Sequence, residues 1–187
     1  MIPPHTRFET PEYSGTWFSF DGDRMKLRAC IEAFLRRELD DSEGVLQVDD
    51  RGPHWKGSVR LTGISYSHTD EIAVLAYSRT HELGVDVENL YREFSQEPSK
   101  LAERFFSENE ARRLRGRAEL LVRWIQKEAY AKLTREGLKE TIRMDLSSLL
   151  APDEDFDLTR PAFKKIAKIP VSYEAWIALR QKPVENT

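Results

Sequence analysis

Hydrophobic positions recur early in the chain at the spacing of an amphipathic helix. Asp21 or Asp23 can cap a helix that continues to about Leu39, because an Asp side chain accepts hydrogen bonds from the free N–H groups of a first turn. Residues 1–20 are rich in Pro, Thr, Ser and aromatic residues, and we expect an extended lead-in there. The predicted helix has one apolar stripe to bury, which consists of Leu27, Ile31, Phe34, Leu35 and Leu39.

Three later segments alternate between apolar and polar residues, with the period of two that a pleated strand imposes. They cover about 59–66, 72–78 and 83–88, and turn residues separate them. This pattern predicts an antiparallel meander. The connection from residue 40 to residue 57 contains glycines and a proline, and we expect it to be rich in turns.

The second half of the chain has mainly helical periodicity. Ser107 followed by Glu110 fits a capping box, in which each side chain bonds a backbone N–H group at the helix start. The order of elements indicates an α+β protein of two halves joined near residue 82. Helices are predicted over about 97–105, from Ser107 onward and over about 118–135 with a stop at Gly137, and strands near 141–149, 155–159 and 171–180.

The composition fits a folded protein without a nucleic-acid or membrane signature. Of its 187 residues, 40% are hydrophobic and 33% charged, which is enough apolar material for a core. The 29 basic and 32 acidic residues give a formal charge of −3, so nothing global argues for nucleic acid or an anionic membrane. The single cysteine, Cys30, suits a reducing cytosol. Without an apolar run of signal-peptide or membrane-span type, the chain is expected to be cytoplasmic.

Two short segments carry candidate chemistry. In GVDVE, Asp86 and Glu88 alternate with valines, so both carboxylates are expected on the strand face opposite the core. In WIQKEAYAK, Trp124, Glu128 and Lys132 recur every four residues and share one helix face. Magnesium takes one or two protein carboxylates and completes its shell with water and substrate oxygens. Three carboxylates and a lysine therefore point to transfer of a phosphate-linked group.

These segments also carry a family resemblance. The DxE strand, the W-x-x-K-E-A-x-x-K helix, GISYSHTD (63–70) and RFFSENEARRL (104–114) occur in an order that resembles the 4′-phosphopantetheinyl transferases. Within that family the chain looks like the larger, monomeric type that activates peptide, polyketide and fatty-acid synthases. The resemblance runs from about Arg24 to about Leu149, and the ordered set is far more specific than any one motif.

The resemblance implies a fold and a reaction. The fold would be two pseudo-symmetric halves, each an antiparallel sheet with flanking helices, with the active site in the cleft between them. Residues 1–81 would bind the nucleotide of coenzyme A, and residues 82–187 would hold the metal site and dock the carrier protein. The reaction would move 4′-phosphopantetheine from coenzyme A to a serine of an acyl or peptidyl carrier protein, releasing adenosine 3′,5′-bisphosphate.

Roles for individual residues follow from the same resemblance. Asp86, Glu88 and Glu128 would ligate Mg²⁺, with Mn²⁺ as the alternative, and Glu128 and Lys132 would be catalytic, Glu128 as a base for the carrier serine. Taken singly, each carboxylate also fits a solvated surface. Glu110 is either a residue near the metal or simply the capping partner of Ser107. Coenzyme A contacts are expected from Arg24, Arg28, Ser67, His68, Lys127 and Lys132.

Two further features bear on partners. The run RRLRGR would offer a basic rim to an acidic carrier protein, unless it is only solvated surface. Arg51-Gly52-Pro53 departs from the G-K-P or G-R-P loop of relatives, and the first half is short. These departures leave open an alternative function, a non-catalytic homologue that binds coenzyme A or docks carrier domains. The arginines of the run are Arg112, Arg113, Arg115 and Arg117.

Overall fold

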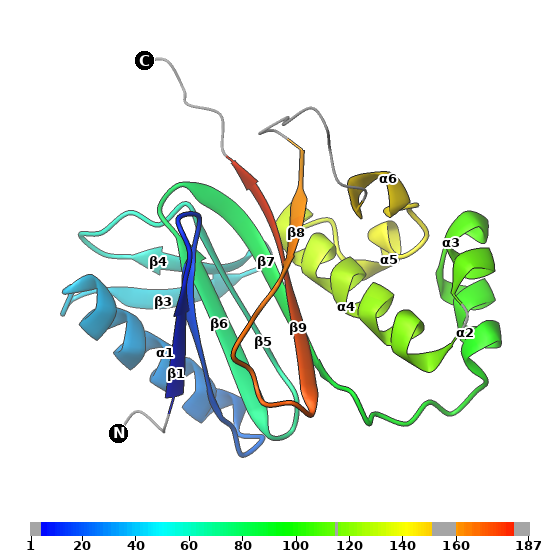
Figure 1. Ribbon diagram of the computed structural model, residues 1–187. Coiled ribbons are helices and arrows are strands. Elements are labelled where there is room, and N and C mark those ends of the chain that lie inside the picture. The colour runs from blue at the N-terminus through cyan, green and yellow to red at the C-terminus, as the bar shows by residue number, and fades with distance from the viewer. Residues whose placement is uncertain (1–4, 115, 151–159, 182–187) are drawn as a thin grey trace.

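The computed structural model describes residues 5–114, 116–150 and 160–181 (Figure 1). Its first sheet has four antiparallel strands in the order β1-β2-β6-β5. The inner strand β6 is apolar over residues 72–76, and its alternate residues enter two different cores, with Leu75 in one and Val74 in the other. The strands are β1 (His5–Glu9), β2 (Ser14–Ser19), β5 (Gly63–His68) and β6 (Ile72–Ser78).

Helix α1 (Arg24–Leu39) packs on this sheet as the sequence predicts. The Asp23 side chain caps it, and the five residues of the predicted stripe are all buried. The following connection is not merely a series of turns, because it forms the antiparallel hairpin of β3 (Val45–Asp49) and β4 (Gly52–Lys56). Apolar side chains from both of these strands pack against the α1 core.

Two predictions for the first half of the chain are wrong. Residues 1–20 are not just an extended lead-in, since they contain the β1–β2 hairpin, whose aromatic residues Phe8, Tyr13 and Phe18 are buried. The predicted three-stranded meander is also wrong at its third strand. β7 (His81–Asn89) pairs with β9 (Tyr173–Gln181) instead of β6, so a second sheet begins there.

The second sheet has the order β7-β9-β8 and is covered by helices on one side (Figure 1). Strand β9 confirms the expected last strand, but the region near 141–149 is helical rather than extended. The long helix ends at Thr134, with Arg135 as its C-cap at a left-handed φ of 61°, so the stop comes before Gly137. The strand expected at 155–159 lies outside the described residues. The remaining elements are α2 (Pro98–Phe105), α3 (Glu108–Arg113), α4 (Arg117–Thr134), α5 (Leu138–Thr141), α6 (Ser147–Leu150) and β8 (Ala162–Lys165).

The helices and antiparallel sheets confirm the predicted α+β fold class. The two sheets share one apolar core. Val74 of β6, Val85 of β7 and Ile177 of β9 belong to the same buried cluster. Strand β7 also lies beside β5, where the Val85 N–H donates to Ser65 Oγ over 3.1 Å. In the described part of the chain, no helix is long and apolar enough to cross a membrane.

Gly84 allows α4 to approach β7 closely. A Cβ at this position would lie 2.1 Å from the Ala129 carbonyl oxygen and 2.5 Å from the Leu133 nitrogen. Both are backbone atoms, so a side chain would have to move the whole helix.

We therefore expect Gly84→Ala to lower the free energy of unfolding by about 1–3 kcal/mol, the usual cost of overpacking a core. Urea denaturation measures this. Gly116→Ala is the control, because no atom lies within 4 Å of a Cβ there; since Gly116 is the N-cap of α4, where Ala is less favourable, we expect a loss of less than about 1 kcal/mol. Equal losses in both variants would contradict the close-approach argument.

Candidate functional site

Strand β7 presents two carboxylates to α4 because its other face is committed to the core. Val85 and Val87 are buried in the apolar cluster, so Asp86 and Glu88 project from the opposite side. That side is the one where Gly84 meets α4. Asp86 is only 5% exposed, which is rare for an aspartate without charged partners.

Both donors to Asp86 bind the same oxygen. Oδ1 accepts hydrogen bonds from Ser67 Oγ at 2.7 Å and from Lys132 Nζ at 2.8 Å. Lys132 also donates to the Val85 carbonyl oxygen at 3.0 Å. The other oxygen, Oδ2, is buried and has no hydrogen-bond partner among the described residues. A buried carboxylate oxygen without a donor is costly, so this atom indicates a ligand.

Glu88 and Glu128 belong to the same electrostatic cluster. Burial raises the pKa of both glutamates, and the charge of Asp86 raises both further. The nearby cations oppose this rise, chiefly Arg92 for Glu88 and Lys132 for Glu128. Two glutamates whose ionised form is disfavoured, beside the carboxylate of Asp86, favour an additional cation.

These residues fit a hard divalent cation. The available donors are carboxylate oxygens, which Mg²⁺ and Mn²⁺ prefer, and Asp86 Oδ2 is free to bind. Across the described residues, no three or more His, Cys, Asp or Glu side chains are already arranged to hold a metal ion together. Glu88 is instead hydrogen-bonded to the exposed Arg92. Because magnesium needs only one or two protein carboxylates, Asp86 with one glutamate is a sufficient anchor.

The expected coenzyme A contacts are distributed over several elements. Arg24 and Arg28 lie one turn apart at the start of α1, and both are exposed. His68 ends β5, with its ring against Phe20 and its Nδ1 3.2 Å from the Thr69 carbonyl oxygen. Since a carbonyl only accepts, Nδ1 is the donor and Nε2 remains for another partner.

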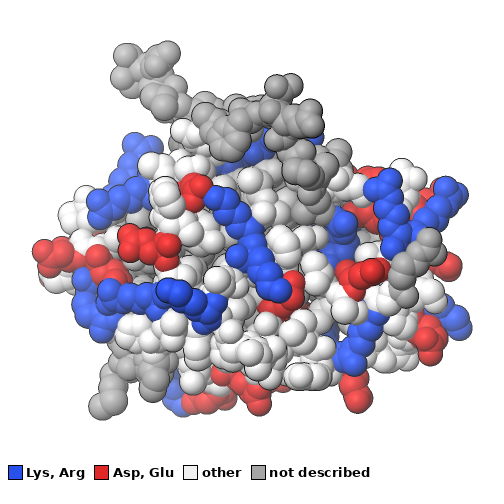
Figure 2. All heavy atoms as spheres, viewed as in Figure 1, with Lys and Arg blue, Asp and Glu red and all other residues white. Residues whose placement is uncertain are grey.

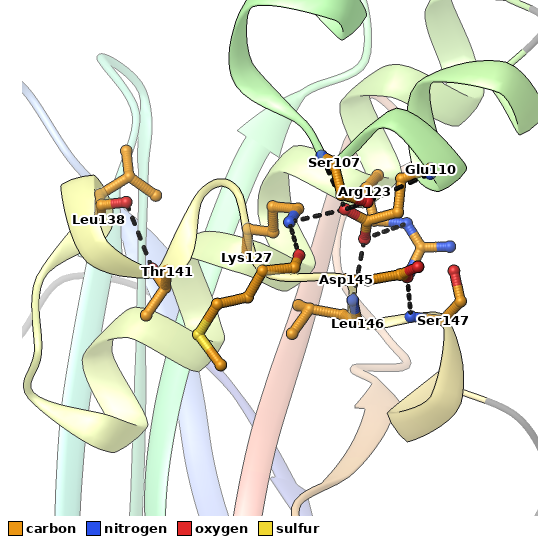
Figure 3. Close-up of polar contacts among 10 residues, drawn as sticks. Ser107, Glu110, Arg123, Lys127, Leu138, Thr141, Asp145, Leu146 and Ser147 are labelled. Carbon is orange, nitrogen blue, oxygen red and sulfur yellow. Dashed lines mark hydrogen bonds and ion pairs between the residues drawn. The ribbon is translucent and has the colours of Figure 1, made fainter.

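Lys127 lies in a different environment from the one that the sequence predicts. Its side chain is 0% exposed, and its Nζ is 2.8 Å from Glu110 Oε2 and also donates to the Met144 carbonyl oxygen (Figure 3). Burial lowers the pKa of Lys127, while the Glu110 carboxylate counteracts that effect. The phosphate contact predicted for Lys127 is therefore not retained, because the ammonium group has no exposed surface.

Glu110 forms the centre of this second cluster, and both of its carboxylate oxygens accept hydrogen bonds (Figure 3). The capping box is confirmed, with Ser107 Oγ accepting from the Glu110 N–H and the Glu110 side chain accepting from the Ser107 N–H. Glu110 Oε1 accepts from the Leu146 N–H at 3.1 Å and lies 3.8 Å from Arg123 Nε. These contacts fasten α3 and the turn before α6 to α4, and they account for Glu110 as a structural residue.

The arginine run is exposed but not uniformly free. Arg112 pairs with Glu108, and Arg117 donates to the Arg92 carbonyl oxygen and lies over the Phe94 ring. Arg113 is exposed, whereas Arg115 lies outside the described residues. Figure 2 shows basic side chains interspersed with acidic ones on this side of the molecule.

Sequence reasoning missed Arg92 and did not assign Arg123 to Glu110. Arg92 contacts Glu88 from the loop after β7, and Arg123 contacts Glu110 from α4. Arg92 follows Glu88 by four residues, but that spacing has no meaning after a strand. Arg123 and Lys127 share a helix face by their i,i+4 spacing, which was the one available signal for a joint role.

The Glu110–Lys127 pair gives a stability prediction. Lys127→Met should lower the free energy of unfolding by about 3–5 kcal/mol, because it leaves a buried carboxylate without its main counter-charge. The double variant Glu110→Gln/Lys127→Met should lose less than the sum of the two single variants. Urea denaturation measures each, with Arg112→Ala on the exposed pair as a control expected to change by less than about 1 kcal/mol. Additive losses would contradict a coupled pair.

The comparison with known families agrees with this geometry. The family model of the 4′-phosphopantetheinyl transferase superfamily matches residues 82–178, which span β7, all the described helices after it and most of β9. No curated protein matches the chain. The match covers just over half of the chain and contains Asp86, Glu88, Glu128 and Lys132. The chain therefore belongs to the 4′-phosphopantetheinyl transferase superfamily.

Proposed function

We propose that the chain transfers 4′-phosphopantetheine from coenzyme A to a serine hydroxyl of an acyl or peptidyl carrier protein, as an enzyme of the holo-acyl-carrier-protein synthase type. Membership of the superfamily gives phosphopantetheine transfer in general. The observation that carries the proposal is the buried, unpaired Asp86 Oδ2 beside two glutamates of raised pKa.

Asp86, Glu88 and Glu128 would hold the divalent cation, Mg²⁺ or alternatively Mn²⁺. When bound, the cation supplies positive charge to the diphosphate of coenzyme A. Glu128 would also act as the general base and accept the proton of the carrier serine. The serine oxygen then forms a bond to the phosphorus that bears pantetheine. The bond from that phosphorus to the bridging oxygen breaks, and adenosine 3′,5′-bisphosphate leaves with the electron pair.

Lys132 has one further N–H bond that could donate to a phosphate. Its ammonium group has three N–H bonds, and the contacts to Val85 and Asp86 use two of them. The third can donate to a phosphate oxygen while Lys132 remains anchored. This arrangement would position the substrate without a large movement of the side chain.

The first half would bind the nucleotide. Arg24 and Arg28 suit the 3′-phosphate, because exposed guanidinium groups one turn apart can each form paired hydrogen bonds. As an imidazolium, in which both ring nitrogens carry a hydrogen, His68 would donate Nε2–H to a phosphate. The division into residues 1–81 and 82–187 is supported by the family match, which begins at residue 82, and by the sheet boundary before β7.

The carrier protein would dock on the arginines at the end of α3 and the start of α4, with Arg112, Arg113 and Arg117 facing its acidic surface. We also propose that the enzyme belongs to the larger type, acts as a monomer and is cytoplasmic. These proposals rest on the resemblance in the motifs and on the single cysteine rather than on a described contact.

The non-catalytic alternative loses part of its motivation. The Arg51-Gly52-Pro53 sequence lies at the turn of the β3–β4 hairpin, where Gly52 has a φ of 97°. This conformation favours glycine, so the order of the three residues has a local explanation. The remaining question is whether transfer occurs.

Intact-protein mass spectrometry answers that question. An apo carrier protein incubated with the chain, coenzyme A and Mg²⁺ should gain the mass of phosphopantetheine. EDTA and Glu128→Gln should each abolish the gain, since they remove the cation and the base. Glu136→Gln is the matched control and should remain active, because Glu136 is exposed and lies two residues beyond the end of α4. Coenzyme A binding without any mass gain would favour the non-catalytic alternative.

Charge reversal tests the docking surface. Arg112→Glu/Arg113→Glu should raise the KM for the carrier protein roughly tenfold and leave kcat unchanged, because the arginines attract the carrier but do not touch the reacting atoms. Steady-state kinetics at two salt concentrations measures this, and high salt should reduce the difference. Arg60→Glu in the first half is the control. An equal effect of Arg60→Glu would show that only net charge matters.

A further inference from the structure

Ser67 joins the two halves of the chain at the candidate metal site. It lies on β5 of the first sheet, is 8% exposed, and donates its hydroxyl hydrogen to Asp86 Oδ1 on β7 of the second sheet. Ser65, two residues earlier on the same face of β5, accepts from the Val85 N–H. Both serines therefore contact β7, but only Ser67 contacts the carboxylate.

The hydrogen-bonding capacity of a hydroxyl limits what Ser67 can do. A serine side chain has one O–H, and in this structure it is directed to Asp86. Toward a phosphate the same oxygen would present only lone pairs, and these repel the anion. Ser67 cannot orient Asp86 and donate to coenzyme A at the same time.

The neutral hydroxyl also differs from Lys132, the other donor to Oδ1. Both hydrogen bonds end on Oδ1, so Oδ2 is left without a donor among the described residues. Ser67 does so without cancelling the negative charge of Asp86, so the attraction for a cation remains. If Lys132 turns toward a phosphate, Ser67 is the donor that still holds the carboxylate in place.

We propose that Ser67 is a positioning residue that orients Asp86 for the divalent cation, rather than a contact to coenzyme A. The inference rests on the proposed function, because it concerns the same metal site. It replaces the phosphate contact that the motif alone predicts for Ser67.

Metal binding by the full-length chain is the direct test. Mn²⁺ affinity is measured by electron paramagnetic resonance with saturating coenzyme A and no carrier protein, so that no turnover occurs. Ser67→Ala should weaken Mn²⁺ binding by about 10–100-fold, the usual effect of losing a hydrogen bond to a metal ligand. Ser67→Thr, which keeps the hydroxyl, should bind Mn²⁺ nearly as well as the wild type.

Ser65→Ala is the matched control, because it removes a buried hydroxyl from the same face of β5 without touching Asp86. Its Mn²⁺ affinity should be that of the wild type. The affinity for coenzyme A in EDTA, measured by calorimetry, should be unchanged in Ser67→Ala.

Three results would overturn the proposal. Weaker coenzyme A binding by Ser67→Ala in EDTA, with Mn²⁺ affinity unchanged, would make Ser67 a phosphate contact. Equal losses of Mn²⁺ affinity in Ser65→Ala and Ser67→Ala would indicate a packing effect, and no Mn²⁺ binding by the wild type would remove the site itself. If Mn²⁺ binding depends on the Ser67 hydroxyl but the wild type transfers nothing to a carrier, the proposed function fails and the positioning role of Ser67 stands.

Discussion

The close packing of α4 on β7 is the constraint on which the site depends. Position 84 has no room for a side chain, so the helix backbone lies directly against the strand. This proximity lets Lys132 reach both the Val85 carbonyl and Asp86, and it brings Glu128 into the field of Asp86. A helix displaced by one side-chain layer would separate these charges and leave two ordinary surface carboxylates.

Two ion clusters on adjoining faces of α4 show how a structural cluster differs from the candidate functional site. Around Glu110, carboxylate oxygens meet backbone and side-chain donors from three elements, and Lys127 is fully buried with its charge matched. Around Asp86, carboxylates outnumber the cations within direct contact, and one oxygen has no donor. Lys127 and Glu128 are neighbours in the sequence, yet one stabilises the fold while the other lies where a ligand would bind.

Much of this arrangement could be predicted from local patterns. The stripe of α1, the capping box at Ser107 and the valine alternation of β7 each depend on neighbours a few residues away, and all three are present. Strand partners were harder, because β7 pairs with β9 about 90 residues later and nothing in either strand specifies that choice. The burial of Lys127 was equally difficult to predict from the sequence. A helix position shows its angle around the axis but not which element covers it.

The core shared by the two sheets has a consequence for how the molecule unfolds. Phe8 and Val74 from the first sheet pack in the same cluster as Val87 and Ala175 from the second. The region that matches the family model, residues 82–178, is therefore not an autonomous folding unit, since separating it would expose the inner face of both sheets. The halves are coupled in one cooperative transition, and a site that uses Ser67 from one and Asp86 from the other exists only while that whole core is intact.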